Sequence, residues 1–437
     1  MDRAITEQKS KGFGEREVPL FDPVFTKWIL LLALPLLFLP KWNLVTIQAE
    51  TAGVRIDDLI LLGVGGLVFL AHLWTHPPIL PLEKAIFGFT LASLASFFLN
   101  KVLVQAGEMV LEAKIFYVFR LAEYFLFFYI GRLAALYIEI RQLFLILFGW
   151  NALWMLLQKG SWVGGWSVVG YMDVSSRVQG IASFPSEMGL WLNLLFCWFF
   201  FEEGDRSHKK PLLLLSIFLA CTLLTVWTGN RISMMALFLA ALWGFYRDFS
   251  KYPLMMQWGL LSLWPLFLAI GWAWIAATEP VVERSKDLLS WKNFSLIEEV
   301  WNHTIDDPLQ PENMPMEELD TSWWLRIHKW VYVLKLYLSQ PLCYLQGIGP
   351  GVAWSALDGG WLRIWTETGF LGLFLFIWIL RLLGAIHRKM RWMVFVWLLN
   401  SMFFDAYLAY KPMSLLFFTA GCLHDRQKQS SIKKNLS

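Results

Sequence analysis

The sequence predicts an all-α polytopic membrane protein, and two features of its composition carry that prediction. Hydrophobic residues make up 57% of the chain and charged residues only 16%, whereas a soluble globular domain carries about 25% charged residues. Apolar runs of about 15 to 25 residues, the length that crosses a hydrocarbon core about 30 Å thick, recur along nearly the whole chain. We therefore expect about twelve transmembrane helices, with one large outer loop between the ninth and the tenth.

The positions of the apolar runs give the expected helices. Their cores span 25–43, 58–75, 84–100, 113–136, 141–158, 186–203, 211–228, 231–247, 254–277, 360–384, 391–405 and 411–425. They divide the chain into an N-terminal tail 1–24, helices over 25–277, a loop 278–359, helices over 360–425 and a C-terminal tail 426–437. The first segment is charged and the first apolar run is long enough to span, so we expect no cleavable signal peptide.

Lysine and arginine set the orientation, because cytoplasmic loops carry the positive excess. With both termini inside, the inner segments collect most of these residues: Arg3, Lys9, Lys11, Arg16, Arg206, Lys209, Lys210, Arg381, Arg388, Lys389, Arg391, Arg426, Lys428, Lys433 and Lys434. The short outer loops hold fewer, and acidic residues partly offset them. Both ends of the chain are therefore expected on the cytoplasmic side and the long loop on the outer side.

The long outer loop has two halves of different character. Its first half, which includes NHTIDDPLQPENMPMEELD, is polar, contains proline and shows no core-forming pattern. Its second half is mainly apolar from Ser322 to Ser339, with Arg326, Lys329 and Lys335 as the main interruptions. This pattern predicts a helix that either lies on the outer membrane surface or packs on the outer ends of its neighbours. Both alternatives place Arg326 near the interface.

The sequence shows no pattern for a disulfide, a metal or another cofactor. The cysteines, which lack disulfide and metal spacing, are Cys197, Cys221, Cys343 and Cys422, and we expect them to be packing residues. His303, Asp306 and Asp307 are residue types that bind metals, but the loop offers no further ligands at suitable spacing. We expect neither a metal nor a cofactor.

Arginines at the predicted outer ends of helices are candidate anion ligands. Arg177 lies in a loop bent by Gly and Pro, Arg231 lies at a helix junction, and Arg326 begins the interfacial segment. A guanidinium keeps its charge and offers a planar fork of donors that suits phosphate oxygens. Together the three could hold a diphosphate. The alternative is that each arginine reaches lipid headgroups or pairs with a nearby acid. Such acids are Asp173, Glu187 and Glu367.

Polar groups inside the apolar regions are also candidates for function, because they are costly in a membrane unless they bind a partner. Arg120 lies three residues before Glu123 on a predicted helix, so we expect the two to form a buried pair. The bent segment Gly347 to Gly351 and the acid Asp358 precede a long apolar helix. The region from Trp323 to Gly372 therefore predicts a functional site at the edge of the membrane.

Four stretches of the chain together resemble the O-antigen ligase and O-antigen polymerase superfamily. They are RVQGIASFPSEMGLWLN (177–193), TGNRISMMALFLA (228–240), LRIHKWVYVLKLYLSQPLCYLQGIGPG (325–351) and DGGWLRIWTETGFLGLFLF (358–376). Each motif is degenerate, and the specific signal is their order over roughly 170–380. The resemblance implies a GT-C type glycosyltransferase in a bacterial inner membrane, with its active site facing the periplasm.

The resemblance also implies a reaction and its partners. Such enzymes take a glycan from an undecaprenyl diphosphate carrier and join it to an acceptor hydroxyl, with inversion and without a nucleotide sugar or a required metal. A repeat-unit polymerase is favoured, and a ligase that joins glycan to lipid A core is the alternative. Other polysaccharide-assembly proteins and the bilayer are expected partners, and no nucleic acid is expected.

Residue roles carried over from the resemblance centre on Asp358. Ligases have a histidine at this position, in a pattern that leads to Glu-x-Gly, where this chain has Asp358 and then Glu367. An aspartate can accept the proton of the acceptor hydroxyl or bind sugar hydroxyls. Arg231 and Arg326 are the expected catalytic arginines, and His328 is a rival base. Substrate-binding residues are expected to be Arg177, Arg231, Arg326, Trp361, Glu367 and His328.

Tryptophans gather at the predicted outer face, where their rings could stack on sugars or form an interfacial aromatic belt. They are Trp162, Trp166, Trp323, Trp324, Trp354, Trp361 and Trp365.

Two other classes of protein are also compatible with outer arginines. A flippase for lipid-linked oligosaccharide should spread its charges through the bilayer midplane and show two similar halves, whereas this chain gathers them at one face. A noncatalytic scaffold would bind lipid carriers or partner enzymes, and Asp358 would then be dispensable.

Overall fold

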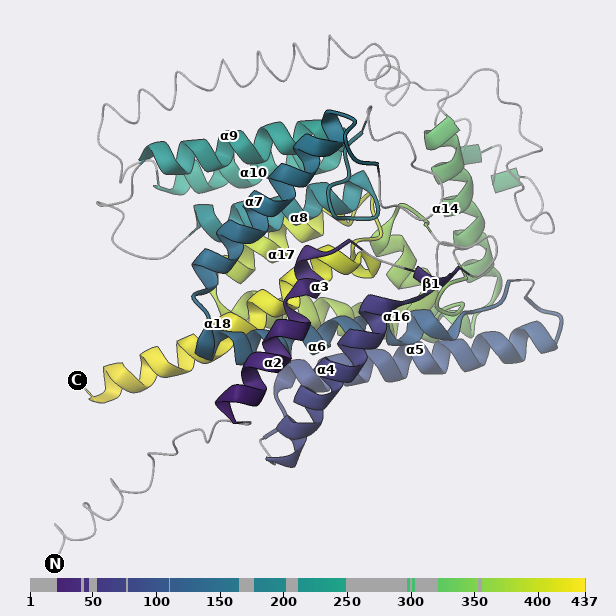
Figure 1. Ribbon diagram of the computed structural model, residues 1–437. Coiled ribbons are helices and arrows are strands. Elements are labelled where there is room, and N and C mark those ends of the chain that lie inside the picture. Colours follow the sequence, from purple (N-terminus) through teal and green to yellow (C-terminus); the bar gives the residue numbers. More distant parts are fainter. Residues whose placement is uncertain are drawn as a thin grey trace, which may run out of the picture.

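The computed structural model describes residues 22–40, 43–46, 53–75, 78–109, 111–164, 177–201, 211–248, 297–298, 301–302, 321–352 and 356–436. Within these ranges the fold is helical apart from one antiparallel pair of short strands. Most of the helices lie side by side in a bundle, and α14 stands at one end of it (Figure 1). The described residues therefore confirm the helical fold class.

The elements follow one another in this order: α2 (Pro23–Ala33), α3 (Pro35–Phe38), β1 (Asn43–Thr46), β2 (Gly53–Arg55), α4 (Ile56–Trp74), α5 (Pro81–Gln105), α6 (Ile115–Tyr137), α7 (Ile140–Lys159), α8 (Pro185–Phe200), α9 (Pro211–Thr228), α10 (Arg231–Asp248), α14 (Thr321–Ser339), α15 (Cys343–Gln346), α16 (Gly360–Ile386), α17 (Arg388–Asn400), the 3-10 helix η4 (Ala406–Leu408) and α18 (Tyr410–Leu436). Several begin at a proline, whose fixed φ suits a first helical turn and whose missing N–H is not needed there.

Helices occupy the predicted cores, except for 254–277, which lies outside the described residues. The interfacial segment predicted from Ser322 to Ser339 is helix α14. Three predicted helix ends are wrong. The last core, 411–425, continues as α18 to Leu436, so the helix includes most of the predicted C-terminal tail. The first core, 25–43, stops at Phe38, because the next residue is extended and the chain then enters strand β1. The core 391–405 stops at Asn400, where the chain turns before η4.

Helices α4, α5, α7 and α16 are long and apolar enough to cross a membrane, as judged over the residues that the structure describes. Shorter apolar helices occupy Pro23–Phe38, Ser216–Thr228 and Arg231–Gly244. These lengths and compositions are those of a membrane protein. The total of about twelve spans, and the side of the membrane on which the long loop lies, stay predictions from the sequence.

Helix α18 crosses α6 at very short range. A Cβ added to Gly131 of α6 would meet the backbone carbonyl of Phe418. A Cβ added to Gly421 of α18 would meet the carbonyl of Phe128. The thiol of Cys422 donates to the Gly131 carbonyl at 3.2 Å. Glycines at a helix contact are typical of membrane proteins, because they allow the two backbones to approach and pack closely.

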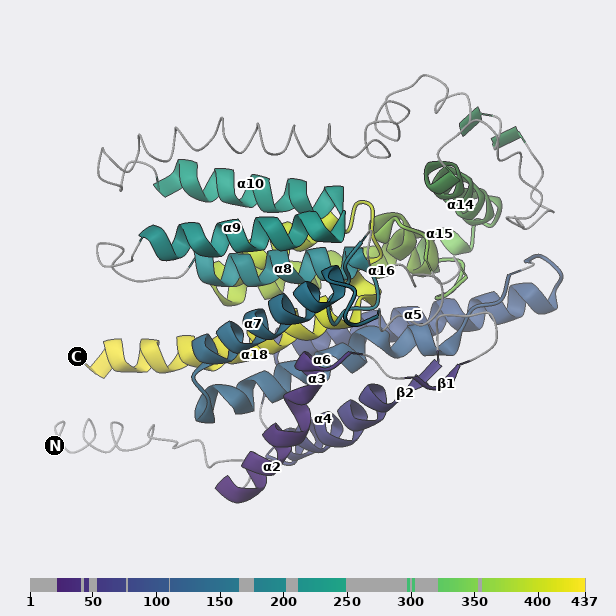
Figure 2. The same ribbon diagram turned by 45° about the horizontal axis from the view of Figure 1, so that its top comes forward.

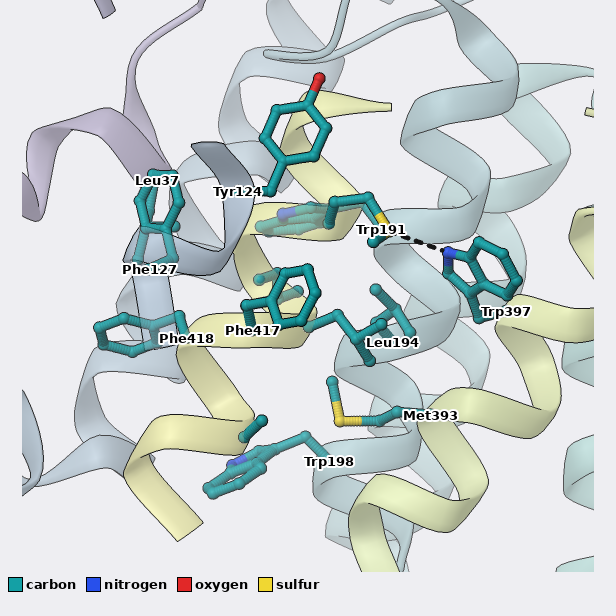
Figure 3. Packing of buried hydrophobic residues seen from close by; sticks show 14 of the residues in the cluster. Leu37, Tyr124, Phe127, Trp191, Leu194, Trp198, Met393, Trp397, Phe417 and Phe418 are labelled. Carbon is teal, nitrogen blue, oxygen red and sulfur yellow. Dashed lines mark hydrogen bonds between the residues drawn. The ribbon is translucent and has the colours of Figure 1, made fainter. Parts of the chain in front are cut away.

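Large aromatic side chains fill the core where α6, α8, α17 and α18 meet (Figure 3). Trp191 of α8 and Trp397 of α17 are fully buried, and the Trp397 indole N–H donates to the sulfur of Met413 at 3.2 Å. The ring of Trp397 also lies 5.5 Å from the ring of Phe376 on α16. This packing fixes α16, α17 and α18 relative to one another.

Helix α16 is interrupted at Gly369, where φ is 66° and ψ is −170°. The last carbonyls before a helix break need donors from outside the helix. Here the amide of Ile348 donates to the Thr366 carbonyl at 2.8 Å, and the amide of Gly349 donates to the Glu367 carbonyl at 3.1 Å. The turn Gly347–Gly351, called here the glycine turn, therefore completes the broken helix.

The glycine turn is also tied to α5 and to the start of α6. The Asn100 amide donates to the Ile348 carbonyl at 2.8 Å, and its oxygen accepts from the Ala113 amide at 2.7 Å. The Lys114 amide donates to the Pro350 carbonyl at 2.8 Å. These bonds give the glycine turn a structural role, because its backbone groups join α5, α6 and α16.

The turns that carry the predicted site residues lie at one end of the bundle. This end, called here the α14 end, holds α14, the α9–α10 turn and the start of α16 (Figures 1 and 2). The C-terminal part of α18 reaches the opposite end in both views. Arg177 binds the end of α9, Arg231 begins α10, Arg326 lies on α14 and Asp358 precedes α16, so all four lie at this end.

Replacing Gly369 with alanine should destabilise the protein, because its φ of 66° disfavours a side chain and a Cβ there would meet the Leu345 carbonyl. Strained backbone of this kind costs about 1 to 3 kcal/mol. The apparent melting temperature of the purified protein in detergent should fall. The control is Gly149→Ala in α7, where a Cβ would meet nothing within 4 Å. An equal effect of both variants would contradict the assigned role of Gly369.

Candidate functional site

An ion pair joins the two residues on which the predicted chemistry depends. Arg326 of α14 donates through Nε to Oδ2 of Asp358, which lies just before α16, at 3.1 Å. Both side chains are partly exposed, Arg326 to 32% and Asp358 to 37%. The sequence predicts separate roles for these residues, and the structure brings them into direct contact. A cation and a carboxylate therefore face a partly hydrated surface together.

Helix α14 is held against the residues around Asp358 by two further hydrogen bonds. We call residues 356–359 the Asp358 turn. Lys329 donates through Nζ to the Ala356 carbonyl at 2.9 Å, and the Trp330 indole N–H donates to the Leu357 carbonyl at 2.8 Å. A Cβ added to Gly359 would lie 2.9 Å from Nε1 of Trp330, so the glycine allows this close approach. One side of α14 thus fixes the Asp358 turn.

The backbone at Asp358 adopts an uncommon conformation. Its φ is 57°, in the left-handed region that aspartate and asparagine visit more readily than most residues. The amides on both sides of it donate to one carboxylate: Leu357 to Oδ2 of Asp405 at 2.7 Å and Gly359 to Oδ1 at 3.3 Å. The Asp358 turn is therefore held from α14 through its carbonyls and from Asp405 through its amides.

Burial and nearby charges act on Asp358 in opposite directions. Burial raises the pKa of the Asp358 carboxyl, and the negative charge of Asp405 adds to that effect. Arg326 and Lys329 oppose it, yet the net pKa lies above the ordinary value for aspartate. Burial in turn lowers the pKa of the Lys329 ammonium. A carboxyl with a raised pKa is a better proton acceptor when it is ionised, as a general base requires.

A buried ionic network lies directly behind the Asp358 turn. Arg363 on the first turn of α16 donates through Nε to Glu367 at 3.0 Å and through Nη1 to Asp405 at 2.8 Å. The Tyr407 hydroxyl donates to Glu367 at 3.0 Å. The side chains of Arg363 and Glu367 are 0% exposed, so the guanidinium meets its carboxylates away from water.

Part of this network is indicated by a spacing in the sequence. Arg363 and Glu367 stand four residues apart in an otherwise apolar segment, which is the spacing of a helical ion pair. Ionisable residues in such a segment are candidates for function. Asp405 gave no comparable signal, because it lies 42 positions from Arg363 in the chain.

Two predicted substrate-binding residues contribute to packing in different degrees. Glu367 is fully buried and is bound by Arg363 and Tyr407 in the buried network. Trp361 is half-buried, and its ring packs against the aromatic core, 6.1 Å from that of Trp397 and 6.2 Å from that of Phe376. The burial of Glu367 favours support of the site from within over contact with a sugar. His328 is half-buried on α14, two residues from Arg326, and therefore on a different face of the helix.

The other two arginines lie together at the α9–α10 turn. Arg177 donates through Nε to the Thr228 carbonyl at the last residue of α9, at 3.1 Å. A cation is favoured there by the exposed carbonyls of a helix C-terminus. Arg231 is the first residue of α10 and is half-buried. The amide of Val178 also donates to the Trp227 carbonyl at 2.9 Å, which fixes the Arg177 loop to α9.

Contacts at the α14 end connect the α9–α10 turn to the start of α16. The Asn230 amide group donates to the Ser233 hydroxyl at 2.8 Å, and that hydroxyl donates to Oδ1 of Asn400 at 2.5 Å. The next residue, Ser401, has its carbonyl 3.0 Å from a Cβ added to Gly360. The end of α17 thus lies between the α9–α10 turn, where Arg177 and Arg231 lie, and the start of α16.

The acids that the sequence suggests as alternative partners of the outer arginines are Asp173, Glu187 and Glu367, and the two that the structure describes bind other groups. Oε2 of Glu187 accepts from the Ser183 amide at 2.9 Å, and its Oε1 accepts from the Lys411 amide at 2.9 Å. Glu367 binds Arg363, and Asp173 lies outside the described residues. Arg326 does pair with an acid, but the acid is Asp358, which was not among the three expected from the sequence.

The predicted pair of Arg120 and Glu123 is confirmed: Nη1 of Arg120 lies 3.0 Å from the Glu123 carboxylate. Asp58 is a second carboxylate partner of Arg120 at 3.2 Å.

All four cysteines are buried as free thiols, which agrees with a packing role. Trp162 is 78% exposed, and the ring of Trp365 lies 5.4 Å from that of Tyr337. Trp166, Trp354, His303, Asp306 and Asp307 lie outside the described residues.

No model of a known protein family matches this chain, and a comparison with curated proteins finds no match. The assignment of a function therefore depends on the residues and on the geometry of the site.

The arrangement at the α14 end can do two things chemically. Guanidinium groups there can bind an anion such as a diphosphate, because they keep their charge at any accessible pH and donate in a fixed plane. The Asp358 carboxylate can accept a proton, and Arg326 at 3.1 Å keeps it oriented. A site that joins fixed positive charge to a base suits the departure of an anionic group together with the activation of a hydroxyl.

The two ion pairs at this site should differ sharply in their effect on stability. Replacing Arg363 with alanine leaves Glu367 and Asp405 buried without their cation, and breaking a buried pair costs about 3 to 5 kcal/mol. Replacing Arg326 with alanine breaks a partly exposed pair, which is worth at most about 1 kcal/mol. Thermal unfolding of the purified variants should therefore show a large loss for Arg363→Ala only. Similar melting temperatures for both variants would show that the network does not hold the fold together.

Proposed function

We propose that this protein is an inverting membrane glycosyltransferase that transfers a glycan from undecaprenyl diphosphate to an acceptor hydroxyl at its α14 end. The observation that carries the proposal is the ion pair of Arg326 and Asp358, which sets a phosphate-binding group beside a proton acceptor at 3.1 Å. The presence of Arg177 and Arg231 at the same end supports it. The stretches 177–193, 228–240, 325–351 and 358–376 resemble the O-antigen ligase and polymerase superfamily. This resemblance supports undecaprenyl diphosphate as the carrier of the donor glycan.

The proposed step is a direct displacement at the anomeric carbon of the donor. The acceptor oxygen attacks that carbon, the bond from carbon to the diphosphate oxygen breaks, and the anomeric configuration inverts. The hydroxyl proton passes to the Asp358 carboxylate, and the electron pair of the broken bond stays on the diphosphate. Arg326, with Arg177 and Arg231, neutralises the charge that grows on the leaving group. The leaving diphosphate needs no proton, so one base is sufficient.

A repeat-unit polymerase is the favoured form of this activity. The support is the aspartate at position 358, where the ligase pattern has a histidine. The acceptor would then be the end of another glycan chain rather than lipid A core. We further propose that the α14 end faces the periplasm and that both termini lie in the cytoplasm of a bacterial inner-membrane protein. The charge distribution of the inner and outer loops supports this orientation.

Replacing Arg326 with alanine should abolish glycan transfer while the protein still inserts and folds, because the pair that is lost is partly exposed. The assay uses purified protein in liposomes with a lipid-diphosphate-linked repeat unit, with and without lipid A core, and sizes the products. The wild type should give a ladder without lipid A core.

The matched control for that experiment is Arg381→Ala. Arg381 lies over the ring of Trp378 at 5.3 Å, toward the far end of α16 from Gly360, and should not affect transfer. Full transfer by Arg326→Ala would rule out its role in charge neutralisation. A product that appears only with lipid A core would mean a ligase, and movement of intact donor across the bilayer without transfer would mean a flippase.

Replacing Asp358 with asparagine should slow transfer by about 10²- to 10⁴-fold, the usual contribution of a positioned base, with little change in donor affinity. In the wild type, transfer should decline as the pH falls through the raised pKa of Asp358, because the basic form is lost there. That decline should begin above the pH at which an ordinary aspartate, with a pKa of about 3.9, takes up its proton.

Lys329→Met supplies an internal check on this pH dependence. Lys329 lowers the pKa of Asp358, so its removal should raise that pKa further and move the acidic limb of the rate profile to higher pH. A profile that has no acidic limb would exclude Asp358 as the base. An acidic limb that Asp358→Asn leaves unchanged would exclude it too and would favour His328.

A further inference from the structure

Asp405 holds both backbone amides that flank Asp358. Its Oδ2 accepts from the amide of Leu357 at 2.7 Å, and its Oδ1 accepts from the amide of Gly359 at 3.3 Å. The same Oδ2 accepts from Nη1 of Arg363 at 2.8 Å. Asp405 itself is buried, with 6% of its surface exposed, and it lies in the turn between α17 and η4. One carboxylate therefore connects the buried network to the Asp358 turn.

The need to neutralise Arg363 does not explain this second carboxylate. Glu367 already pairs with Arg363 at 3.0 Å from the next turn of the same helix. One carboxylate balances one guanidinium, and a further buried charge costs desolvation energy unless it makes strong bonds of its own. The bonds that distinguish Asp405 from Glu367 are those to the amides of Leu357 and Gly359, which are charge-assisted and therefore strong.

Those two bonds act on a residue whose backbone needs support. Asp358 has a φ of 57°, and a side chain in this region costs about 1 to 2 kcal/mol unless its surroundings impose it. Asp405 fixes the Gly359 amide, which belongs to the peptide plane that follows the Cα of Asp358, and the Leu357 amide, which lies one peptide further back. The plane between Leu357 and Asp358 is held by the Leu357 carbonyl, which accepts from the Trp330 indole N–H. The direction of its side chain toward Arg326 follows from those planes.

We propose that Asp405, anchored on Arg363, is a positioning residue that holds Asp358 toward Arg326 and the acceptor hydroxyl by binding the two amides that flank it. This role is an addition to the proposed function and depends on it, because positioning affects the rate only if Asp358 takes the proton. Asp405 itself lies behind the turn and acts through Asp358. Misplacement of a reacting group by about 1 Å can cost about 10²-fold in rate.

Asp405→Asn tests the proposal in the liposome assay. The asparagine keeps the size of the side chain but loses the charge and one acceptor oxygen. We expect kcat to fall by about 10²-fold while KM for the donor stays nearly constant, since Arg326 remains in place. Asp405→Glu keeps the charge and both acceptors, and it should restore part of kcat.

The matched control is Glu83→Gln in α5. Like Asp405, Glu83 uses its carboxylate to bind a backbone amide, that of Leu80 at 2.7 Å, and a side chain, the Tyr129 hydroxyl at 2.6 Å. It lies near the start of α5, while the α14 end holds the end of that helix. Its kcat should stay close to that of the wild type. A fall of kcat equal to that of Asp405→Asn would show a general effect of carboxylates that bind backbone amides and overturn the proposal.

A second measurement does not depend on glycan transfer. Asp358→Cys places a thiol at the turn, and the native cysteines are buried, so a hydrophilic thiol reagent should label position 358 selectively. Adding Asp405→Asn should change the labelling rate several-fold, and adding Glu83→Gln should not. An unchanged rate, like an unchanged kcat, would overturn the proposal. Altered labelling in a protein whose wild type shows no transfer would keep the positioning role and reject the proposed function. If Asp405→Asn does not fold, Asp405→Glu takes its place in both measurements.

Discussion

The neutralisation of one buried cation organises the α14 end of this protein. Arg363 is fully buried, and a guanidinium keeps its charge at any accessible pH, so it requires a carboxylate at hydrogen-bond distance. Glu367 supplies that carboxylate from the same helix, and Asp405 adds a second one from the turn after α17. Because Asp405 also binds the amides around Asp358, this network sets the start of α16, the end of α17 and the Asp358 turn relative to one another.

The surrounding helices add constraints of a different kind. The break in α16 at Gly369 exposes carbonyls that the glycine turn satisfies, and Asn100 fixes that turn to α5. Helix α14 then closes over the Asp358 turn through Lys329 and Trp330. The result is a rigid inner shell of backbone bonds and buried charge, with Arg326 and Asp358 partly exposed at its surface. A site of this construction suits the proposed transfer, since preorganised charges stabilise a developing anion better than mobile ones.

The sequence could predict the helices, because the length of an apolar run indicates the length of a buried or membrane-crossing helix. It could also single out Arg326 and Asp358, which interrupt apolar segments near helix ends. It could not predict that the two touch, because they are 32 residues apart and spacing rules predict contacts only within a helix or between paired strands. For the same reason the sequence could not predict the contact of Asp405 with Arg363, which is 42 residues away. The glycine turn was expected at a binding site because it bends; only the positions of Thr366 and Glu367 reveal that its amides complete a helix.

An electron cryomicroscopy map of the protein with bound undecaprenyl diphosphate would test the central claim most directly. The claim is that the charged groups of the α14 end form the donor site, with Asp358 beside the leaving group. The diphosphate density should then lie within hydrogen-bond distance of Arg326, at the end of the bundle that also holds Arg177 and Arg231. Diphosphate density at the opposite end of the bundle, or at the α14 end but out of reach of Arg326 and Asp358, would contradict the account.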